Sequence, residues 1–190
     1  MMKELEDRIR MDGQVLPGNI LKVGSFLNQK IDYRLLADMG AEAARLFGGC
    51  GITKVVTVET SGIAIACAAG MALGADIVFA KKHQTGNVSG ELYSATAHSY
   101  THNNDYRMIV PTAYLGPDDT VLLTDDFLAT GAAFFALLDI VKQSGAKLAG
   151  ILAQVEKGFQ DGGKKLRDMG IRVESLAIVD SMENGLVFRS

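Results

Sequence analysis

Residues 121–133 read VLLTDDFLATGAA, an apolar run followed by two adjacent acids and then by small residues. The pattern VLLTD is typical of a buried strand, which would carry Asp125 and Asp126 to its carboxyl end. Thr130 and the small residues after it then open a helix that we expect to reach about Gln143. Free backbone N–H groups at such a helix start bind phosphate, and carboxylates accept hydrogen bonds from sugar hydroxyls. The stretch therefore predicts a loop that holds a phosphorylated ribose at two points. An ordinary turn capped by Thr130 is the alternative.

The rest of the chain alternates strands and helices in the same way. We expect further strands at about 54–59, 76–82, 108–111, 148–155 and 173–178, and helices at about 32–47, 62–73 and 162–169. Continuous apolar strands separated by buried helices are typical of an α/β fold with a doubly wound, mostly parallel sheet. Ligands of such sheets bind beyond the carboxyl ends of the strands, so residues that follow each strand are the candidates for function.

Two segments break this alternation within what we interpret as one domain, residues 1–190. A short amphipathic helix should end near Gly13, and an irregular stretch follows from Val15 to Asn28. The second segment, 84–106, is polar and long. A connection of this kind is usually a lid, a hairpin or disordered.

Composition and charge restrict the classes of function. The formal net charge of -3 argues against nucleic acid or an anionic membrane as partner. The two cysteines form no CxxC pair, which favours a reducing, cytoplasmic setting. The charged N-terminus is unlike a signal peptide, and the longest apolar run, 62–74, is too short to span a bilayer. No GxxxxGK[ST] loop occurs, and no GxGxxG follows a strand.

Polar residues also follow the first two strands. Thr60, Ser61 and Gly62 begin a helix and could form a second anion site, although helix capping is favoured from the residues alone. Lys81 and Lys82 could meet diphosphate oxygens, and a solvated charge pair is an equal alternative.

The motif at 121–133 resembles the 5-phosphoribosyl 1-pyrophosphate (PRPP) signature of the type I phosphoribosyltransferases. The likeness covers nearly the whole chain and is greatest for bacterial members that use xanthine. It is carried by LKVGSFLNQKID (21–32), GITKVVTVETSGIA (51–64), VFAKKH (78–83), TDDFLATG (124–131) and VEKGF (155–159). The resemblance implies the fold of that family, with a flexible lid at about 84–106 and a small N-terminal hood at about 1–31. It implies transfer of phosphoribose from PRPP to xanthine, which gives xanthosine 5'-monophosphate and pyrophosphate. It also implies Mg²⁺ held mainly by PRPP, with no direct side-chain ligand.

The same resemblance assigns roles to individual residues. The implied catalytic residues are Asp125 and Asp126. The residues implied to bind PRPP are Ala129, Thr130, Gly131, Ala132, Ala133, Thr60, Ser61, Gly62, Lys81, Lys82 and the lid residues Ser99 and Tyr100. The residues implied to bind the base are Leu21, Asn28, Lys157 and Phe159. A lysine donates hydrogen bonds and cannot accept them, so Lys157 suits a 6-oxopurine and opposes adenine. Phe159 could stack on the base. Without the resemblance, Lys157 would be read as a surface residue, and Phe159 and Leu21 as core.

Two positions depart from the family pattern. Gln84 stands where relatives often have another lysine, and Ala129 stands where hypoxanthine–guanine enzymes have an acid that handles the purine N7 proton. Xanthine is more acidic and needs such help less, so Ala129 slightly favours xanthine. The alternatives are a hypoxanthine–guanine or adenine phosphoribosyltransferase, a non-catalytic PRPP-binding regulator, and a bare sugar-phosphate-binding domain.

We also expect a homodimer. Enzymes of the resembled family commonly pair, and Met39, Phe47, Phe134 and Phe135 supply more apolar surface than one small sheet needs, unless all four are core.

Overall fold

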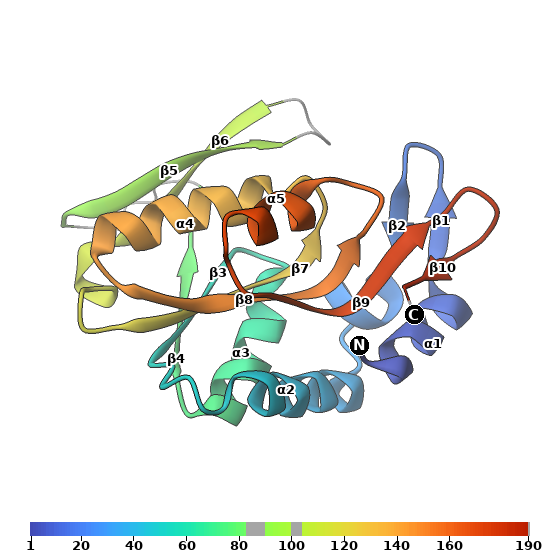
Figure 1. Ribbon diagram of the computed structural model, residues 1–190, viewed down its shortest axis with the longest axis horizontal. Helices are drawn as coiled ribbons and strands as arrows, with labels where there is room; N and C mark the ends of the chain where they lie inside the picture. Colours follow the sequence, from blue (N-terminus) through green and yellow to red (C-terminus); the bar gives the residue numbers. More distant parts are fainter. Residues whose placement is uncertain (83–89, 100–103, 190) are drawn as a thin grey trace.

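A six-stranded, mostly parallel sheet forms the centre of the molecule (Figure 1). The computed structural model describes residues 1–82, 90–99 and 104–189. The strands of the sheet are β3 (Lys54–Val58), β4 (Asp76–Ala80), β7 (Thr120–Leu128), β8 (Lys147–Lys157), β9 (Val173–Ser181) and β10 (Val187–Phe188). They lie in the order β10-β9-β8-β7-β3-β4, and only β10 runs antiparallel to its neighbour. The expected α/β fold class is confirmed.

Helices cover both faces of this sheet. Figure 1 shows α2 (Tyr33–Phe47) and α3 (Gly62–Leu73) on one face, and α4 (Ala132–Ser144) and α5 (Gly162–Asp168) on the other. The Asp32 side chain caps α2 by accepting from the N–H groups of Arg34 and Leu35. α3 is apolar along its whole length and ends at Gly74, whose φ of 69° suits a residue without a Cβ.

The N-terminal segment is more regular than its sequence suggests. After α1 (Lys3–Asp12) come a short hairpin of β1 (Gln14–Leu16) and β2 (Ile20–Lys22) and a π-helical turn, Gly24–Asn28. The expectation of an irregular stretch is wrong, because Gly18 and Asn19 take positive φ angles and turn the chain tightly between the two strands. We call residues 1–31 the hood; Figure 1 shows it beside β9 and β10.

The polar segment forms a hairpin in its described residues, which is one of the three forms expected for it. β5 (Leu92–Ser99) pairs antiparallel with β6 (Asn104–Pro111), and a short 3₁₀ turn, Thr112–Tyr114, follows. The strand expected at 108–111 is therefore part of this hairpin and does not join the parallel sheet. Buried Ala95, Ala97, Met108 and Val110 belong to the same core cluster as the buried residues of α4. That packing explains the position of the hairpin over α4 in Figure 1.

Three of the four residues proposed for a dimer surface are buried in the interior. Met39, Phe47 and Phe134 are at most 1% exposed, and Phe135 is partly buried against the same core as Phe134. They fill the two layers between sheet and helices, so they supply no surface for a second copy. No helix in the described residues combines the length and hydropathy needed to cross a membrane.

Candidate active site

Two buried acids lie near the carboxyl end of the central strand β7. Asp125 is 6% exposed and Asp126 is 8% exposed. They were expected at the carboxyl end of a strand that ends at Asp125, but the strand continues past them, because pairing with β8 runs through Phe127 to Leu128. The N–H of Asp126 donates to Asp125 Oδ1 and the N–H of Phe127 donates to Asp126 Oδ1, each over 3.0 Å.

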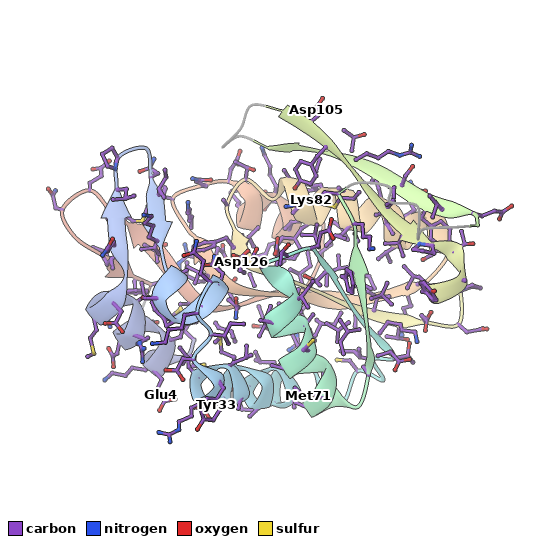
Figure 2. All side chains as sticks on the ribbon, turned by 180° about the vertical axis from the view of Figure 1, so that it is seen from behind. Glu4, Tyr33, Met71, Lys82, Asp105 and Asp126 are labelled. Carbon is purple, nitrogen blue, oxygen red and sulfur yellow. The ribbon has the colours of Figure 1, made fainter. Side chains whose placement is uncertain are left out.

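Charge is concentrated around this acid pair. Burial, and then the charge of Asp126, raises the pKa of the Asp125 carboxyl well above its usual range, while the Lys82 cation acts in the opposite direction. Burial also raises the pKa of the Tyr106 phenol, and the Asp125 charge adds to that rise. Figure 2 shows Lys82 and Asp126 together in the middle of the molecule, below the β5–β6 hairpin.

A cavity of about 490 Å³ lies between the start of α4, the end of β8 and the hood hairpin. Its wall consists of Gly18, Asn19, Ile20, Tyr106, Phe127, Ala129, Thr130, Gly131, Ala132, Ala133, Phe134, Lys157 and Gln160. All five residues expected to bind the phosphate at 129–133 therefore meet in one place. The N-cap of α4 is Gly131, not Thr130, and it brings no side-chain cap. The first N–H groups of the helix thus remain available to an anion.

The start of α3 lies against the acid pair. A Cβ on Gly62 would stand 2.8 Å from Asp125 Oδ1 and would also overlap Thr57 Oγ1. Only glycine lets the helix start approach the acids this closely. Ser61 is the N-cap and makes no side-chain capping bond, and Thr60 is exposed. Thr57 Oγ1 is buried without a hydrogen-bond partner among the described residues.

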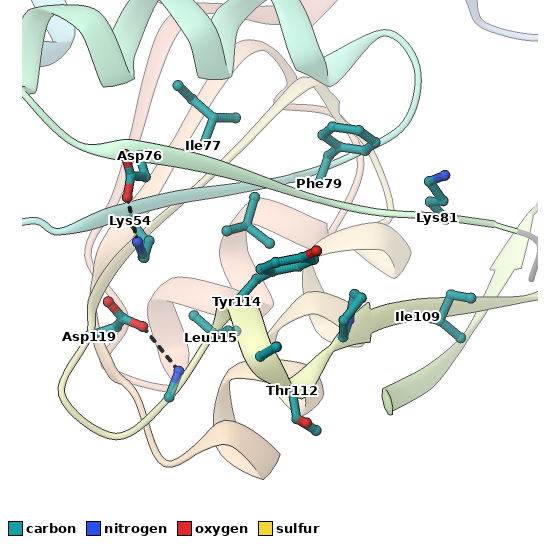
Figure 3. A pocket seen from close by; sticks show the side chains of 14 residues that line it. Lys54, Asp76, Ile77, Phe79, Lys81, Ile109, Thr112, Tyr114, Leu115 and Asp119 are labelled. Carbon is teal, nitrogen blue, oxygen red and sulfur yellow. Dashed lines mark hydrogen bonds and ion pairs between the residues drawn. The ribbon is translucent and has the colours of Figure 1, made fainter. Parts of the chain in front are cut away.

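The two lysines after β4 lie in different places. The Nζ of Lys82 is 5.1 Å from the centre of the Tyr106 ring, near the acids. Lys81 instead lines a second cavity of about 810 Å³ along the outer edge of β4, together with Phe79 and Tyr114 (Figure 3). Side chains of successive residues in an extended chain point to opposite sides. Lys81 and Lys82, which were expected to bind the same diphosphate, therefore lie apart, Lys82 near the acids and Lys81 at the second cavity.

Of the four residues expected at the base, only Lys157 lines the cavity. Its Nζ donates to the Asn19 carbonyl oxygen over 2.8 Å and lies 5.5 Å from the centre of the Phe127 ring. Burial lowers the pKa of its ammonium group. Among the described residues, the cavity wall includes neither Phe159, which is 37% exposed, nor Leu21, which is 5% exposed and part of the core.

Asn28 is also outside that wall and lies instead at the acid pair, where its Nδ2 donates to Asp126 Oδ2 over 2.9 Å. Of the expected lid residues, Tyr100 lies outside the described residues, and Ser99 is described only in its backbone, in β5.

Seven cavity residues were not predicted as site residues: Gly18, Asn19 and Ile20 of the hood hairpin, Phe134 of α4, and Tyr106, Phe127 and Gln160. Phe127 follows the acid pair directly, so its place in the motif could have identified it. Tyr106 and Gln160 carried no such signal, because they reach the cavity only through folding of the β5–β6 hairpin and of the turn after β8. The described residues contain no cluster of three or more His, Cys, Asp or Glu side chains suited to a metal ion.

Proteins of similar sequence share one name. The chain is 50% identical to "Xanthine phosphoribosyltransferase" of Lachnoclostridium phytofermentans, over 99% of this chain and 98% of that protein. It is 49% identical to the protein of the same name from Bifidobacterium adolescentis, over the full length of both. "Xanthine phosphoribosyltransferase 2" of Clostridium botulinum is 47% identical over 98% of this chain and 99% of its own. No protein-family model matches the chain.

Solved structures of similar fold are more distant in sequence. Adenine phosphoribosyltransferase from Thermoanaerobacter pseudethanolicus superposes with a TM-score of 0.73 at 22% identity, covering 92% of this chain and 98% of that one. The enzyme of the same name from Trypanosoma brucei, solved with AMP, pyrophosphate and ribose-5-phosphate, gives a TM-score of 0.77 at 16% identity, with 95% and 83% coverage. At these identities the likeness establishes the fold only.

Proposed function

The chain belongs to the xanthine phosphoribosyltransferase family, and on that premise we propose that it converts xanthine and PRPP into xanthosine 5'-monophosphate and pyrophosphate. One observation carries this proposal beyond family membership. The cavity has an anion-binding helix start at one side, a lysine at the other, and the buried acid pair directly before the Phe127 in its wall. The helix start would bind the phosphate, the acid pair would bind the ribose, and the lysine would bind the base.

The 5-phosphate would bind the N–H groups at the start of α4, at residues 129–133. Asp125 and Asp126 would accept hydrogen bonds from the ribose hydroxyls. When pyrophosphate leaves the sugar C1, a cation-like ribosyl centre remains, and the two carboxylates supply preorganised negative charge beside it. Base and sugar held in attack geometry account for much of the remaining acceleration.

Pyrophosphate would leave on the opposite side of the acids, toward the start of α3 at Thr60, Ser61 and Gly62, with Lys82 as its cation. The closeness of Gly62 to Asp125 supports this placement. Ser99 and Tyr100 remain proposed lid residues that would exclude water from the ribosyl cation. Lys81 lines the cavity at the outer edge of β4 instead and is not part of this proposal.

Mg²⁺ fits this site as an ion carried by PRPP. Asp125 Oδ1 and both Asp126 oxygens already accept hydrogen bonds, and Mg²⁺ usually keeps several waters and takes substrate phosphate oxygens. When bound, the ion would neutralise charge on the leaving diphosphate.

Xanthine would bind beside Lys157. The ammonium group has three hydrogens and gives one to Asn19, which leaves two for the 6-oxo group of a purine. Adenine would present an amino donor there, and an unpaired buried donor costs roughly 1–3 kcal/mol. Phe127 offers an aromatic face in the same wall, the role expected of Phe159. Ala129 supplies no acid for the N7 proton.

The test is to incubate the protein with PRPP, Mg²⁺ and each of xanthine, guanine, hypoxanthine, adenine and uracil, and to separate the nucleotides formed. We expect xanthosine 5'-monophosphate to form with the highest kcat/KM. Lys157→Met should lower kcat/KM for xanthine far more than for adenine, and Lys164→Met, at an exposed ion pair with Asp168, is the matched control. Preference for another purine would favour the alternative phosphoribosyltransferases, and PRPP binding without turnover would favour a regulator.

We further propose a homodimer located in the cytoplasm. The two free cysteines, Cys50 and Cys67, are compatible with a reducing compartment. The groove at the outer edge of β4, with the partly exposed Phe79 and Tyr114, is a better candidate surface for a second copy than the buried residues first considered.

A further inference from the structure

Asn28 joins the hood to the acid pair. It is the last residue of the π-helical turn Gly24–Asn28, and its Nδ2 donates to Asp126 Oδ2 over 2.9 Å. A carboxylate only accepts hydrogen bonds, so the nitrogen of the amide, and not its oxygen, must face Asp126. The hydrogen bond links residues that are 98 positions apart in the sequence.

This bond completes the support of the Asp126 side chain. Asp126 Oδ1 accepts from the N–H of Phe127, so one donor holds each carboxylate oxygen. Donors on both oxygens fix the rotation of the carboxylate plane. The donor from Phe127 belongs to the neighbouring residue of the same strand, whereas Asn28 comes from a different part of the fold.

The hood presents Asn28 from a fixed position. Phe26 and Leu27, directly before it, are 1% and 2% exposed and belong to the core. Two backbone bonds close the turn: Lys30 N–H donates to the Gly24 oxygen, and Asp32 N–H donates to the Phe26 oxygen, each over 2.8 Å. Little conformational freedom therefore remains to be lost when the amide engages the carboxylate.

We propose that Asn28 is a positioning residue, which orients Asp126 for the ribose hydroxyls of PRPP before any base is bound. This inference rests on the proposed function of the acid pair. The proposed role, orienting Asp126, differs from the contact with the base that the sequence analysis expected of Asn28. The hood also reaches the proposed base site, where the Asn19 carbonyl oxygen accepts a hydrogen bond from Lys157 Nζ. The hood then couples the base site to the ribose site.

The experiment measures binding of PRPP with Mg²⁺ by calorimetry with no base present. Asn28→Ala should weaken this binding by about tenfold or more, as expected for loss of a hydrogen bond to a charged group. Ser25→Ala is the matched control, because Ser25 is exposed on the same turn. Asn28→Asp keeps the size of the side chain but sets a second carboxylate against Asp126, so it should weaken binding further.

A double-mutant comparison separates action through Asp126 from any other effect. In an Asp126→Asn background, Asn28→Ala should change PRPP affinity by less than about twofold, since the acceptor charge is already gone. Unchanged PRPP affinity in Asn28→Ala, with a higher KM for xanthine alone, would reduce Asn28 to a base contact. Equal losses in both backgrounds would also overturn the proposal. Failure of the wild-type protein to use xanthine is a different result, and it would reject the proposed function instead.

Discussion

Asp125 is nearly buried and lies beside a second carboxyl group, that of Asp126. Because its pKa is raised in the folded protein, the negative charge of an ionised Asp125 opposes folding. Asp125→Asn removes that charge and keeps an oxygen that can accept from the N–H of Asp126. We expect turnover to fall by roughly a hundredfold or more, from loss of a preorganised electrostatic group, while the free energy of unfolding at pH 7 does not fall. Steady-state kinetics and urea unfolding measure both quantities. Wild-type turnover would refute the catalytic role.

The charge of Lys82 acts to lower the pKa of Asp125, and we therefore expect it to affect the pH dependence of the proposed reaction. If the ionised Asp125 is the active form, kcat/KM declines as pH falls through the raised pKa of Asp125, above the usual range of an aspartate. Lys82 lowers that pKa, whereas burial and Asp126 raise it. Lys82→Gln should therefore move the acidic limb of the pH profile to higher pH. Lys81→Gln is the control, because Lys81 faces the other cavity, and an equal shift there would contradict the assignment.

The position of a residue in the site could be predicted where the local sequence alone determines it. The acid pair and the small residues at 129–133 lie within one strand–loop–helix unit, so their spacing gave their place in the site. The positions of Lys81, Leu21 and Phe159 depend on which side of a strand or turn each side chain faces, which the sequence did not determine. Asn28 was expected at the base and is bonded to an acid, because only the tertiary fold brings the hood to β7.

The start of α4 requires glycine at position 131. Its φ is 85°, and a Cβ there would stand 2.9 Å from the Phe135 ring and 3.3 Å from Gly162 Cα. Gly131→Ala should cost about 1–2 kcal/mol of stability from the left-handed backbone alone. It should also raise the KM for PRPP, since the N–H groups that we propose to bind the 5-phosphate would move. Gly49→Ala, where a Cβ would meet no atom within 4 Å, is the control for both measurements. Unaltered stability in Gly131→Ala would refute this account.

A buried ion pair supports the end of β8 that carries Lys157. Arg167 donates to both oxygens of Glu156 over 2.7 Å, and Ser175 also donates to Glu156. Burial alone would raise the pKa of Glu156, but the hydrogen bonds from Arg167 and Ser175 outweigh it and hold the pKa below its ordinary value. The stabilisation is therefore present above the ordinary glutamate pKa and is lost as pH falls through the lowered one.

Glu156→Gln should reduce the free energy of unfolding at pH 7 by about 2 kcal/mol, as for hydrogen bonds to a charged group. The difference from wild type should shrink toward pH 3. Urea unfolding across this pH range measures it, with exposed Glu183→Gln as control. A difference that stays constant with pH would show that the ion pair does not contribute in this way.

The strands and helices of the parallel core could be predicted from the sequence, but the β5–β6 hairpin and the hood hairpin could not. Each strand of the parallel core is an apolar run next to a helix with its own start and stop signals, such as Asp32 and Gly74, so local rules located them. The β5–β6 hairpin contributes Ala95, Ala97, Met108 and Val110 to the core cluster that includes α4, and its place over α4 comes from this packing. The hood hairpin depends on the three-residue turn 17–19, in which Gly18 and Asn19 take positive φ angles.

The outer edge of β4 is the surface at which we expect a second copy of the chain. Among the described strands β4 pairs only with β3, and Phe79 and Tyr114, 40% and 61% exposed, lie along its free side (Figure 3). An unpaired edge with exposed aromatic residues favours association. Sedimentation at micromolar concentration should give twice the chain mass of 20.3 kDa. Tyr114→Glu should shift the species toward the monomer, because it places a charge in the contact. Tyr33→Glu, at a tyrosine that is 70% exposed on α2, should not. A monomeric wild type, or equal effects of the two substitutions, would exclude this edge as the interface.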